Sequence, residues 1–461
     1  MRKHVVVAGA GMGGLTAAVT ALQAGADVTL LEKSGRAGGS AALSNGMLIA
    51  FGELERFRAA APNGDELLQT LVHETLPAAA DWLTSLGVEL RRLPRQLDRY
   101  DGWHFSPDQY LGLARDEIRR LGAEIRYDTA LDRLWIEDGR IEGVHVVDDT
   151  GAVTALRCDV VILATGGFQG SPELLARYAG LDAAHLAHRA NAFSTGDGLA
   201  AAISVGAGTS AGLGGFYGHA LPAPPARHTA ETFAELAQYY GSRSVALNMA
   251  GRRFVDETAG AFEENVNHAL ARQPGGVGFY VFDAELGAQP SADAMTVTPT
   301  VLAERAEKAG GTVVRADTLD ELAQRIAEHG VPRSVAGTTL RDYARAMAAG
   351  APEQLDIPRT GAGTRLAHGP FTAIHVQAAI TFTTGGLAVD DNLRVLRRSG
   401  STAPMSARWI TDPRDHRAEP IPGLYAVGAD IGGVSAGGYA GGLATALTTG
   451  RAAALDAVAD R

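Results

Sequence analysis

The 461 residues are enough to bury a large core and favour more than one domain. A net charge of −11 without a cluster of Lys or Arg argues against nucleic acid or an anionic membrane as partner. The single cysteine, Cys158, excludes an internal disulfide, a Cys-rich metal site and a Cys-x-x-Cys redox pair. We expect Cys158 to be an inert core thiol and expect no bound metal.

No apolar run approaches the ~20 residues that span a bilayer, and the longest, 160–164, is far shorter. The first predicted strand begins at residue 4, which leaves no room for a signal peptide. We therefore expect a cytoplasmic protein without a membrane span.

The chain opens on a nucleotide-binding fingerprint. In order, it contains an apolar strand at 4–8, the spacing G-x-G-x-x-G, a helix at 15–24, an apolar strand at 28–31, and Glu32. Glycines alone are weak support, because the chain has 57 of them. The whole series in register predicts a Rossmann-like α/β domain that binds a dinucleotide.

Each part of the fingerprint has a mechanical role. Gly9 permits the tight turn, and Gly11 lets the backbone approach a pyrophosphate. Gly14 lets helix and strand pack closely, while the helix N-terminus faces the phosphates. Glu32 is placed to accept hydrogen bonds from a ribose hydroxyl.

The middle of the chain changes character twice. Helix-like spacing covers 62–92 and 106–122; short alternating strands follow at 124–129, 131–137, 141–147 and 153–157, before the apolar strand 160–164. Prolines then cluster, and helical patterns appear at 231–239, at 301–309, from 318, and at 338–349. We therefore predict a discontinuous first domain, residues 1–216 and 361–461, with an inserted α+β capping domain at 217–360.

Three features favour FAD over NAD as the dinucleotide. Gly38, Gly39 and Ser40 form a second glycine turn, whose backbone N–H groups can reach a pyrophosphate. The turn at 164–167 follows a meander instead of a βαβ unit. Asp430 ends a late strand, where it is placed to hold ribityl hydroxyls, and a helix from about Leu443 points its N-terminus at the flavin ring.

With these motifs the chain resembles the flavoprotein family of fumarate reductase and succinate dehydrogenase, which includes the 3-ketosteroid dehydrogenases. The matching motifs are 32–40, 164–168, 194–198, 248–257, 384–387 and 424–442. The resemblance implies an FAD domain with an inserted cap, a substrate at their interface, and transfer of two hydrogens across a carbon–carbon bond. The expected cofactor-binding residues are Gly9, Gly11, Gly14, Glu32, Lys33, Gly38, Gly39, Ser40, Ala164, Thr165, Gly166, Asp197, Asp430, Gly442 and Leu443.

Some members of this family attach FAD covalently through a His beside the glycine pair. The corresponding stretch here, 38–43, contains no His. We therefore expect non-covalent FAD.

The chain departs from the dicarboxylate enzymes of this family at the substrate site. Where the resemblance implies a substrate Arg and His, the chain has Tyr439 and Phe382, and neither 284–287 nor 258–261 contains the expected cap Arg. An unpaired buried carboxylate costs several kcal/mol. Losing all these cations therefore argues against a dicarboxylate and favours a neutral, largely apolar substrate with one hydrogen-bond acceptor.

The 3-ketosteroid dehydrogenases have a Tyr in the same late turn, where it helps bind the ketone oxygen with a backbone N–H. Tyr439, followed by Gly441, resembles that arrangement. Donors at the carbonyl oxygen stabilise an enolate and acidify the adjacent carbon. Tyr217 or His219 is the candidate base, with Tyr240 as a weaker candidate near the substrate; a Tyr would need its pKa of ~10 lowered, whereas His starts near ~6.5.

The main hypothesis is an FAD-dependent dehydrogenase that desaturates a neutral, cyclic or otherwise activated, ketone. The first alternative is an enone or fumarate-type reductase that runs the reverse reaction. A fold that has lost its flavin and an NAD(P)H-dependent hydroxylase are more distant alternatives. The electron acceptor stays open among oxygen, a quinone and a protein carrier.

Two further groups have competing interpretations. Tyr100, Trp103 and His104 form an aromatic stretch that either covers a pocket or packs at the surface. Arg252, Arg253 and Asp256 are expected to make either hinge or fold contacts.

Overall fold

The computed structural model describes residues 2–93, 101–260, 263–290, 297–398 and 418–459, and the chain divides into two compact units. The first unit comprises Met1–Ala179, Ala190–Gly215 and Phe382–Arg461. The second comprises Gly180–Arg189 and Phe216–Thr381. The predicted class, a discontinuous Rossmann-like α/β domain with an inserted α+β unit, is confirmed.

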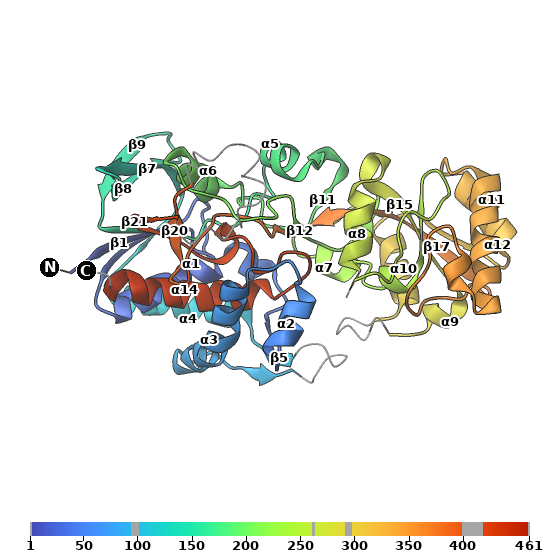
Figure 1. The fold of residues 1–461 in the computed structure, drawn as a ribbon, viewed down its shortest axis with the longest axis horizontal. Coiled ribbons are helices and arrows are strands. Elements are labelled where there is room, and N and C mark those ends of the chain that lie inside the picture. Colours follow the sequence, from blue (N-terminus) through green and yellow to red (C-terminus); the bar gives the residue numbers. More distant parts are fainter. Residues whose placement is uncertain (1, 94–100, 261–262, 291–296, 399–417, 460–461) are drawn as a thin grey trace. The chain divides into compact units, whose positions relative to one another are not determined.

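A six-stranded sheet organises the first unit, in the order β20-β21-β10-β1-β2-β6 (Figure 1). Its strands are β1 (His4–Ala8), β2 (Asp27–Leu31), β6 (Ile125–Arg126), β10 (Val160–Leu163), β20 (Arg394–Leu396) and β21 (Pro420–Ala426). All neighbours from β21 to β6 are parallel, and β20 pairs antiparallel at the edge. Strands covered on both faces need near-continuous apolar sequence, as β1 and β10 have.

The helices α1 (Met12–Gln23) and α14 (Gly442–Ala459) pack on this sheet. Around them, α4 (Pro107–Arg120) packs on α1, α3 (Glu66–Ser85) on α14, and the shorter α2 (Leu54–Ala60) on α3. The other short helices of the unit are α5 (Pro172–Leu174) and α6 (Asp197–Ser204). α1 lies along α14. A Cβ at Gly450 would lie 2.5 Å from the Gly13 carbonyl oxygen, so this close helix contact requires glycine.

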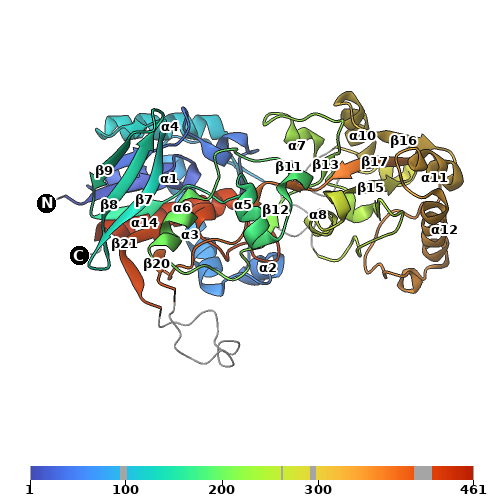
Figure 2. The same ribbon diagram turned by 90° about the horizontal axis from the view of Figure 1, so that it is seen from above.

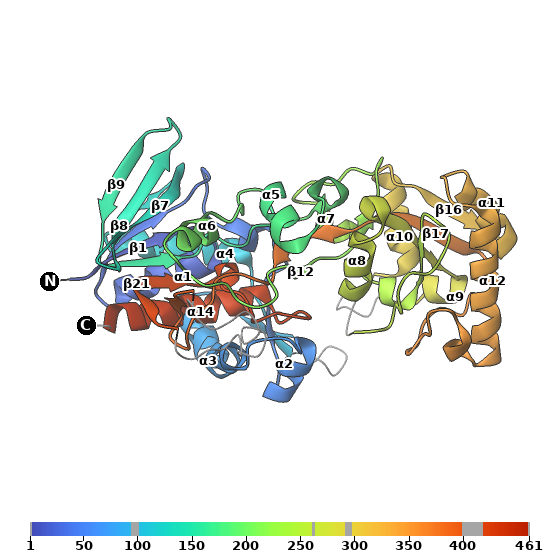
Figure 3. The same ribbon diagram turned by 45° about the horizontal axis from the view of Figure 1, so that its top comes forward.

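The predicted four-stranded meander was wrong in its first strand. Three antiparallel strands form it: β7 (Thr129–Glu137), β8 (Arg140–Asp148) and β9 (Val153–Arg157) (Figure 3). The segment expected at 124–129 yields β6, which joins β2 in parallel with Leu30 opposite Ile125. Asp128, at φ 50°, then turns the chain into β7.

A second, antiparallel sheet organises the second unit (Figure 2). Its strands are β13 (Leu221–Pro222), β14 (Val245–Asn248), β15 (Val277–Phe282), β16 (Val313–Ala316) and β17 (Phe371–Gln377). Other elements of this unit are β11 (Ala187–His188), β12 (Phe216–Tyr217), β18 (Ala379–Ile380), α7 (Phe233–Leu236), α8 (Glu264–Ala271), α9 (Ala284–Gly287), α10 (Pro299–Lys308), α11 (Leu319–Ala327) and α12 (Arg333–Ala349). Leu322, Ile326 and Leu340 join Phe279 in its core.

Pairing explains where the second unit ends. β17 pairs with β13, β15 and β16, so residues 361–381 lie in the second unit, although the glycine-rich pattern suggested a boundary at 360. Two helix predictions also need correction. α7 is shorter than the predicted 231–239 because Ala237 is extended, and α12 begins after Pro332 instead of at Thr338.

Candidate active site

The turn between β1 and α1 brings the backbones of Gly9, Gly14 and Ala164 close together. Gly9 has φ 104°, and a Cβ there would lie 2.2 Å from the Ala164 carbonyl oxygen. A Cβ at Gly14 would lie 1.7 Å from the Gly9 carbonyl oxygen. Both glycines are therefore needed by the protein itself.

Gly11 differs, because no atom of the described residues lies close enough to require glycine there. A Cβ there would meet nothing nearer than Gly38 and Gly39, each at 4.0 Å, and its φ of −80° suits any residue. The open space beside Gly11 lies at the start of α1, where backbone N–H groups favour phosphate. Gly39 packs on this turn, since its Cβ would lie 3.2 Å from the Gly11 Cα. The site thus fits the pyrophosphate of a dinucleotide.

Alanine substitutions should separate these two kinds of glycine. Gly14→Ala is expected to destabilise the fold, because its methyl group meets backbone. Gly11→Ala is expected to keep the apoprotein folded but to weaken FAD binding by about 1–3 kcal/mol, the usual cost of overpacking. Thermal unfolding of the apoprotein and flavin titration measure the two effects; equal FAD affinity in wild type and Gly11→Ala would contradict the assignment.

Glu32, the predicted ribose acid, is held in place by its neighbours. Glu32 is buried, and its Oε2 accepts from the Ala10 N–H at 2.9 Å. Its Oε1 accepts from the N–H and the hydroxyl of Ser34, at 2.8 and 2.7 Å. A carboxylate has about four acceptor sites, so a ribose hydroxyl still finds one.

Lys33 and Asp197 engage each other. The Lys33 Nζ lies 2.8 Å from Asp197 Oδ2 and donates to Thr195 Oγ1 at 2.6 Å. The structure therefore brings these two predicted cofactor residues together as an ion pair. Ser40 is exposed at the start of a short 3-10 helix, Gly39–Leu43.

Asp430 ties the ends of two parallel strands together. It follows β21, and its two oxygens accept from Thr165 Oγ1 at 2.9 Å and from the Gly166 N–H at 3.0 Å. Thr165 Oγ1 in turn accepts from the Gly198 N–H. Burial raises the pKa of Asp430 to about 7, which the Thr165 and Gly166 hydrogen bonds partly oppose.

The raised pKa predicts how apoprotein stability depends on pH. Between the usual aspartate pKa of ~3.9 and about 7, the unfolded chain has lost a proton that the folded chain keeps. The free energy of unfolding should therefore fall, by up to about 1.4 kcal/mol per pH unit, as the pH rises through this window. Asp430→Asn should remove this contribution. Denaturant titrations across the window measure it, and an identical slope in the variant would contradict the prediction.

The late glycine turn gathers several predicted site residues. Gly441, at φ 86°, precedes α14, whose first N–H groups lack intrahelical partners and carry the positive end of the helix dipole. The Tyr439 and Phe382 rings are 6.3 Å apart, and a Cβ at Gly442 would lie 3.6 Å from the Phe382 ring. A half-buried phenol, an aromatic wall and a helix N-terminus therefore meet here.

The two base candidates are bonded to each other in the second unit. Tyr217 Oη lies 2.9 Å from His219 Nε2. His219 is buried and burial lowers its pKa well below 6.5, whereas Tyr217 is half-buried. His219 Nδ1 lies 2.8 Å from Glu263 Oε2. Glu263 has no motif around it, and sequence reasoning missed it.

Tyr240 is a different case. Its side chain is fully buried, with ring contacts to Tyr280 and Phe282. Burial raises its pKa well above 10. We therefore leave Tyr240 out of the proposed proton path.

Residues of the aromatic stretch form a small sheet. β5 (Asp101–His104) pairs with β3 (Met47–Ala50) and β4 (Arg91–Arg92). The Arg92 guanidinium lies 4.7 Å from the centre of the Trp103 ring, and Arg91 contacts His104 Nδ1 at 3.0 Å. These contacts favour surface packing over a lid; Tyr100 lies outside the described residues.

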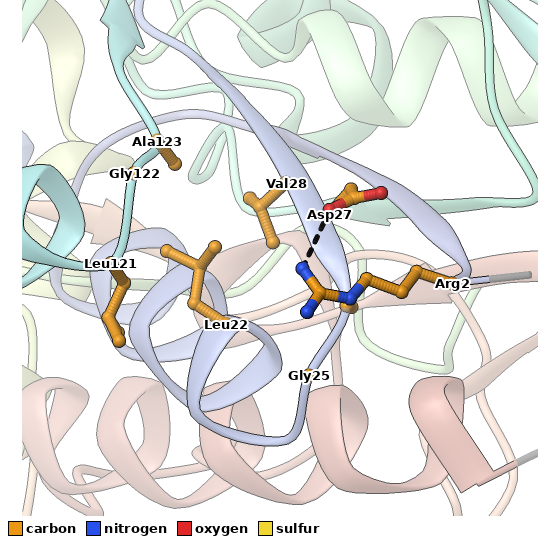
Figure 4. Close-up of a pocket in the computed structure, with 9 residues that line it drawn as sticks. Arg2, Leu22, Gly25, Asp27, Val28, Leu121, Gly122 and Ala123 are labelled. Atoms are coloured by element: carbon orange, nitrogen blue, oxygen red, sulfur yellow. Dashed lines mark ion pairs between the residues drawn. The ribbon is translucent and has the colours of Figure 1, made fainter.

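Three other groups do not contribute to the site. Cys158 is a buried free thiol, and burial raises its pKa to about 12. It is unreactive because it stays protonated at neutral pH, and only the thiolate is a nucleophile. A pocket beside the Arg2–Asp27 ion pair lies where β1 and β2 begin, at the opposite end of these strands from the glycine turns (Figure 4). Within the described part of the chain, no helix is suited to crossing a membrane, and no cluster of acidic, His or Cys side chains could hold a metal ion.

The parallel sheet and the glycine turns at Gly9, Gly11, Gly14 and Gly39 together define a dinucleotide-binding protein. The profile described as FAD binding domain matches residues 4–445, and the chain belongs to this family. FAD is therefore its cofactor.

Known proteins similar to the chain fall into two kinds. The chain is 26% identical over 468 residues to the NADH:fumarate oxidoreductase of Klebsiella pneumoniae, covering 96% of this chain and 46% of that protein. It is 28% identical over 382 residues to a 3-oxosteroid 1-dehydrogenase of Mycolicibacterium smegmatis, covering 74% and 60%. The chain thus spans about half the length of these relatives.

A solved structure shares the fold of the whole chain. The 3-ketosteroid delta1-dehydrogenase from Sterolibacterium denitrificans, in complex with 1,4-androstadiene-3,17-dione, superposes with a TM-score of 0.74 at 19% identity. The match covers 100% of this chain and 99% of that one.

Proposed function

We propose that the chain desaturates a neutral, cyclic or otherwise activated, ketone at its α,β carbon–carbon bond. The observation that carries this proposal is the pairing of Tyr439 with Phe382 beside the first turn of α14. A phenol and an apolar ring suit a ketone, whereas neither side chain can pair with a dicarboxylate, and an unpaired buried carboxylate costs several kcal/mol. The 3-oxosteroid 1-dehydrogenase among the relatives supports this substrate class.

The proposed mechanism assigns one task to each residue. Tyr439 and the Gly441 backbone N–H hold the ketone oxygen and stabilise negative charge as it develops there, which acidifies the α-carbon. Tyr217 takes the α-proton, with His219 behind it. When bound, FAD supplies the two-electron acceptor for the hydride from the β-carbon. We propose that it is held non-covalently, because residues 38–43 contain no His.

Steady-state turnover tests this proposal. Purified holoprotein should convert cyclic ketones to α,β-unsaturated ketones with an artificial electron acceptor, and should leave succinate unchanged. Turnover of succinate, with every ketone inert, would overturn the assignment. The physiological acceptor, which we propose is oxygen, a quinone or a protein carrier, need not be known for this experiment.

The reverse reaction is the second candidate. It is favoured by relatives named as reductases, including the NADH:fumarate oxidoreductase and a vinyl phenol reductase of Lactiplantibacillus plantarum. The same residues would then protonate an enone at its α-carbon. Comparing the rate at which enones oxidise the reduced protein with the rate at which ketones reduce the oxidised protein separates the two directions.

A further inference from the structure

A continuous hydrogen-bonded chain extends inward from Tyr217. Tyr217 Oη is 2.9 Å from His219 Nε2, His219 Nδ1 is 2.8 Å from Glu263 Oε2, and Tyr280 donates to Glu263 Oε1 at 2.7 Å. The side chains of His219 and Glu263 are 4% and 0% exposed. The proposed function uses the first two groups and leaves Glu263, a buried carboxyl, without a task.

We propose that Glu263 is a positioning residue that orients His219 and supplies the negative charge that lets Tyr217 act as a base. The proposal rests on the proposed function, because it deepens the proton-abstraction step. It assigns Glu263 no contact with substrate.

The donors around Glu263 decide which of its oxygens serves the imidazole. Oε1 faces the Tyr280 hydroxyl and the Ala220 N–H, at 2.7 and 3.3 Å, so it acts as an acceptor. Oε2 faces His219 Nδ1, its one hydrogen-bond partner among the described residues. When Glu263 is ionised, Nδ1–H donates to Oε2, which leaves Nε2 bare to accept from the Tyr217 hydroxyl.

The proton balance follows from this arrangement. As the substrate α-proton bonds to Tyr217 Oη, the phenolic proton moves to His219 Nε2. The chain of three groups then changes from one net negative charge to neutral. A buried charge is costly, so taking up the proton removes the desolvation penalty of the Glu263 carboxylate. Because proton uptake is favoured in this way, the buried carboxylate makes the Tyr217 phenol a stronger base.

Groups on several elements face this chain and set its titration. They are Glu264, whose Oε1 lies 3.7 Å from His219 Nε2, together with Tyr239, Tyr240, Tyr280, Arg189 and His268. Burial raises the pKa of Glu263, as does Glu264, whereas Tyr280 and Arg189 lower it. Burial, Arg189 and His268 lower the pKa of His219. The rate of desaturation should therefore fall at low pH, where the hydrogen-bonded series Tyr217–His219–Glu263 gains a proton and becomes neutral.

Glu263→Gln in the FAD-loaded protein tests the assignment. We expect kcat for ketone desaturation to fall by about 10²- to 10⁴-fold, the usual share of general acid–base catalysis, with little change in KM. The acid limb of the kcat–pH profile should move to higher pH. ¹⁵N NMR of His219, at pH values above the acid limb, should show the proton on Nδ1 in wild type. In Glu263→Gln the preference for this tautomer should be lost.

Glu264→Gln is the matched control, because it removes the neighbouring carboxyl, at the first residue of α8, which faces His219 Nε2 and not Nδ1. It should retain the wild-type His219 tautomer. Because Glu264 raises the pKa of Glu263, its loss should move the acid limb to lower pH, opposite to the shift expected in Glu263→Gln. If Glu264→Gln and not Glu263→Gln moves the limb to higher pH, or if wild-type His219 is protonated on Nε2, the proposal is overturned. Should Glu263→Gln fail to fold, Tyr280→Phe removes one donor to Oε1 and should raise the limb by about one pH unit.

The failure of this inference can be told apart from the failure of the proposed function. If no ketone is turned over by wild type, the proposed function fails, and the NMR comparison still tests whether Glu263 fixes His219. If wild type turns over a ketone and Glu263→Gln keeps its kcat and acid limb, only the role of Glu263 fails.

Discussion

Replacing Tyr439 by phenylalanine is expected to lower kcat for ketone desaturation by about 10²- to 10³-fold, the usual effect of removing one oxyanion donor. The ring that packs near Phe382 stays, and only the hydroxyl is lost. FAD content should therefore be unchanged, and KM should change much less than kcat. Rapid mixing of oxidised holoprotein with ketone measures the rate directly.

Phe382→Leu is the control for this experiment. It removes the aromatic wall but leaves the Tyr439 hydroxyl, so it should raise KM more than it lowers kcat. If Tyr439→Phe retains the wild-type rate, Tyr439 only packs in the turn and the ketone oxygen is bound elsewhere.

Glu257→Gln is expected to lower the free energy of unfolding of the protein by about 3–5 kcal/mol. Glu257 is fully buried and accepts from Arg253 Nε at 2.9 Å, from Arg359 Nη1 at 3.1 Å and from the Ala246 N–H at 3.0 Å. Neutralising this carboxylate leaves two guanidinium groups in the core of the second unit without their counter-charge. Guanidinium chloride titration measures the loss.

An exposed ion pair provides the comparison. Glu307 and Arg315 are paired at the surface, with side chains about two-fifths exposed at 42% and 38%. Exposed pairs contribute about 0–1 kcal/mol, so Glu307→Gln should have a small effect. Equal losses in both variants would show that the Glu257 network adds no more than a surface pair. Arg253 lies in this network, and Asp256 accepts from Thr258 and Thr360, as the predicted fold contacts require.

The cofactor end of the protein was predictable from sequence because its geometry is local. Strand, turn, helix and strand between His4 and Glu32 follow each other without interruption, so their spacing fixes the site. The end of its own strand also pointed to Asp430, whereas Tyr439 and Phe382 needed the family resemblance. Nothing local connects Asp430 with Thr165 or Tyr439 with Phe382. Their contacts join residues far apart in the chain.

Long-range pairing explains what the sequence did not predict. Glu263 meets His219 across 44 residues, and an acidic pair before a helix looks like an ordinary exposed helix start. β6 has only two residues, and alternation alone does not distinguish a partner in β2 from one in β7. Residues 361–381 carry β17, whose partners lie throughout the second unit, so local composition misplaced that boundary.

The central claim, that the protein acts on a neutral ketone and not on a dicarboxylate, is tested most directly by anaerobic single turnover. Oxidised holoprotein is mixed without any electron acceptor with a cyclic ketone or with succinate, and flavin absorbance is followed. We predict that the ketone bleaches the flavin and yields one equivalent of α,β-unsaturated ketone, while succinate has no effect. Bleaching by succinate, with no response to any cyclic ketone, would contradict the claim.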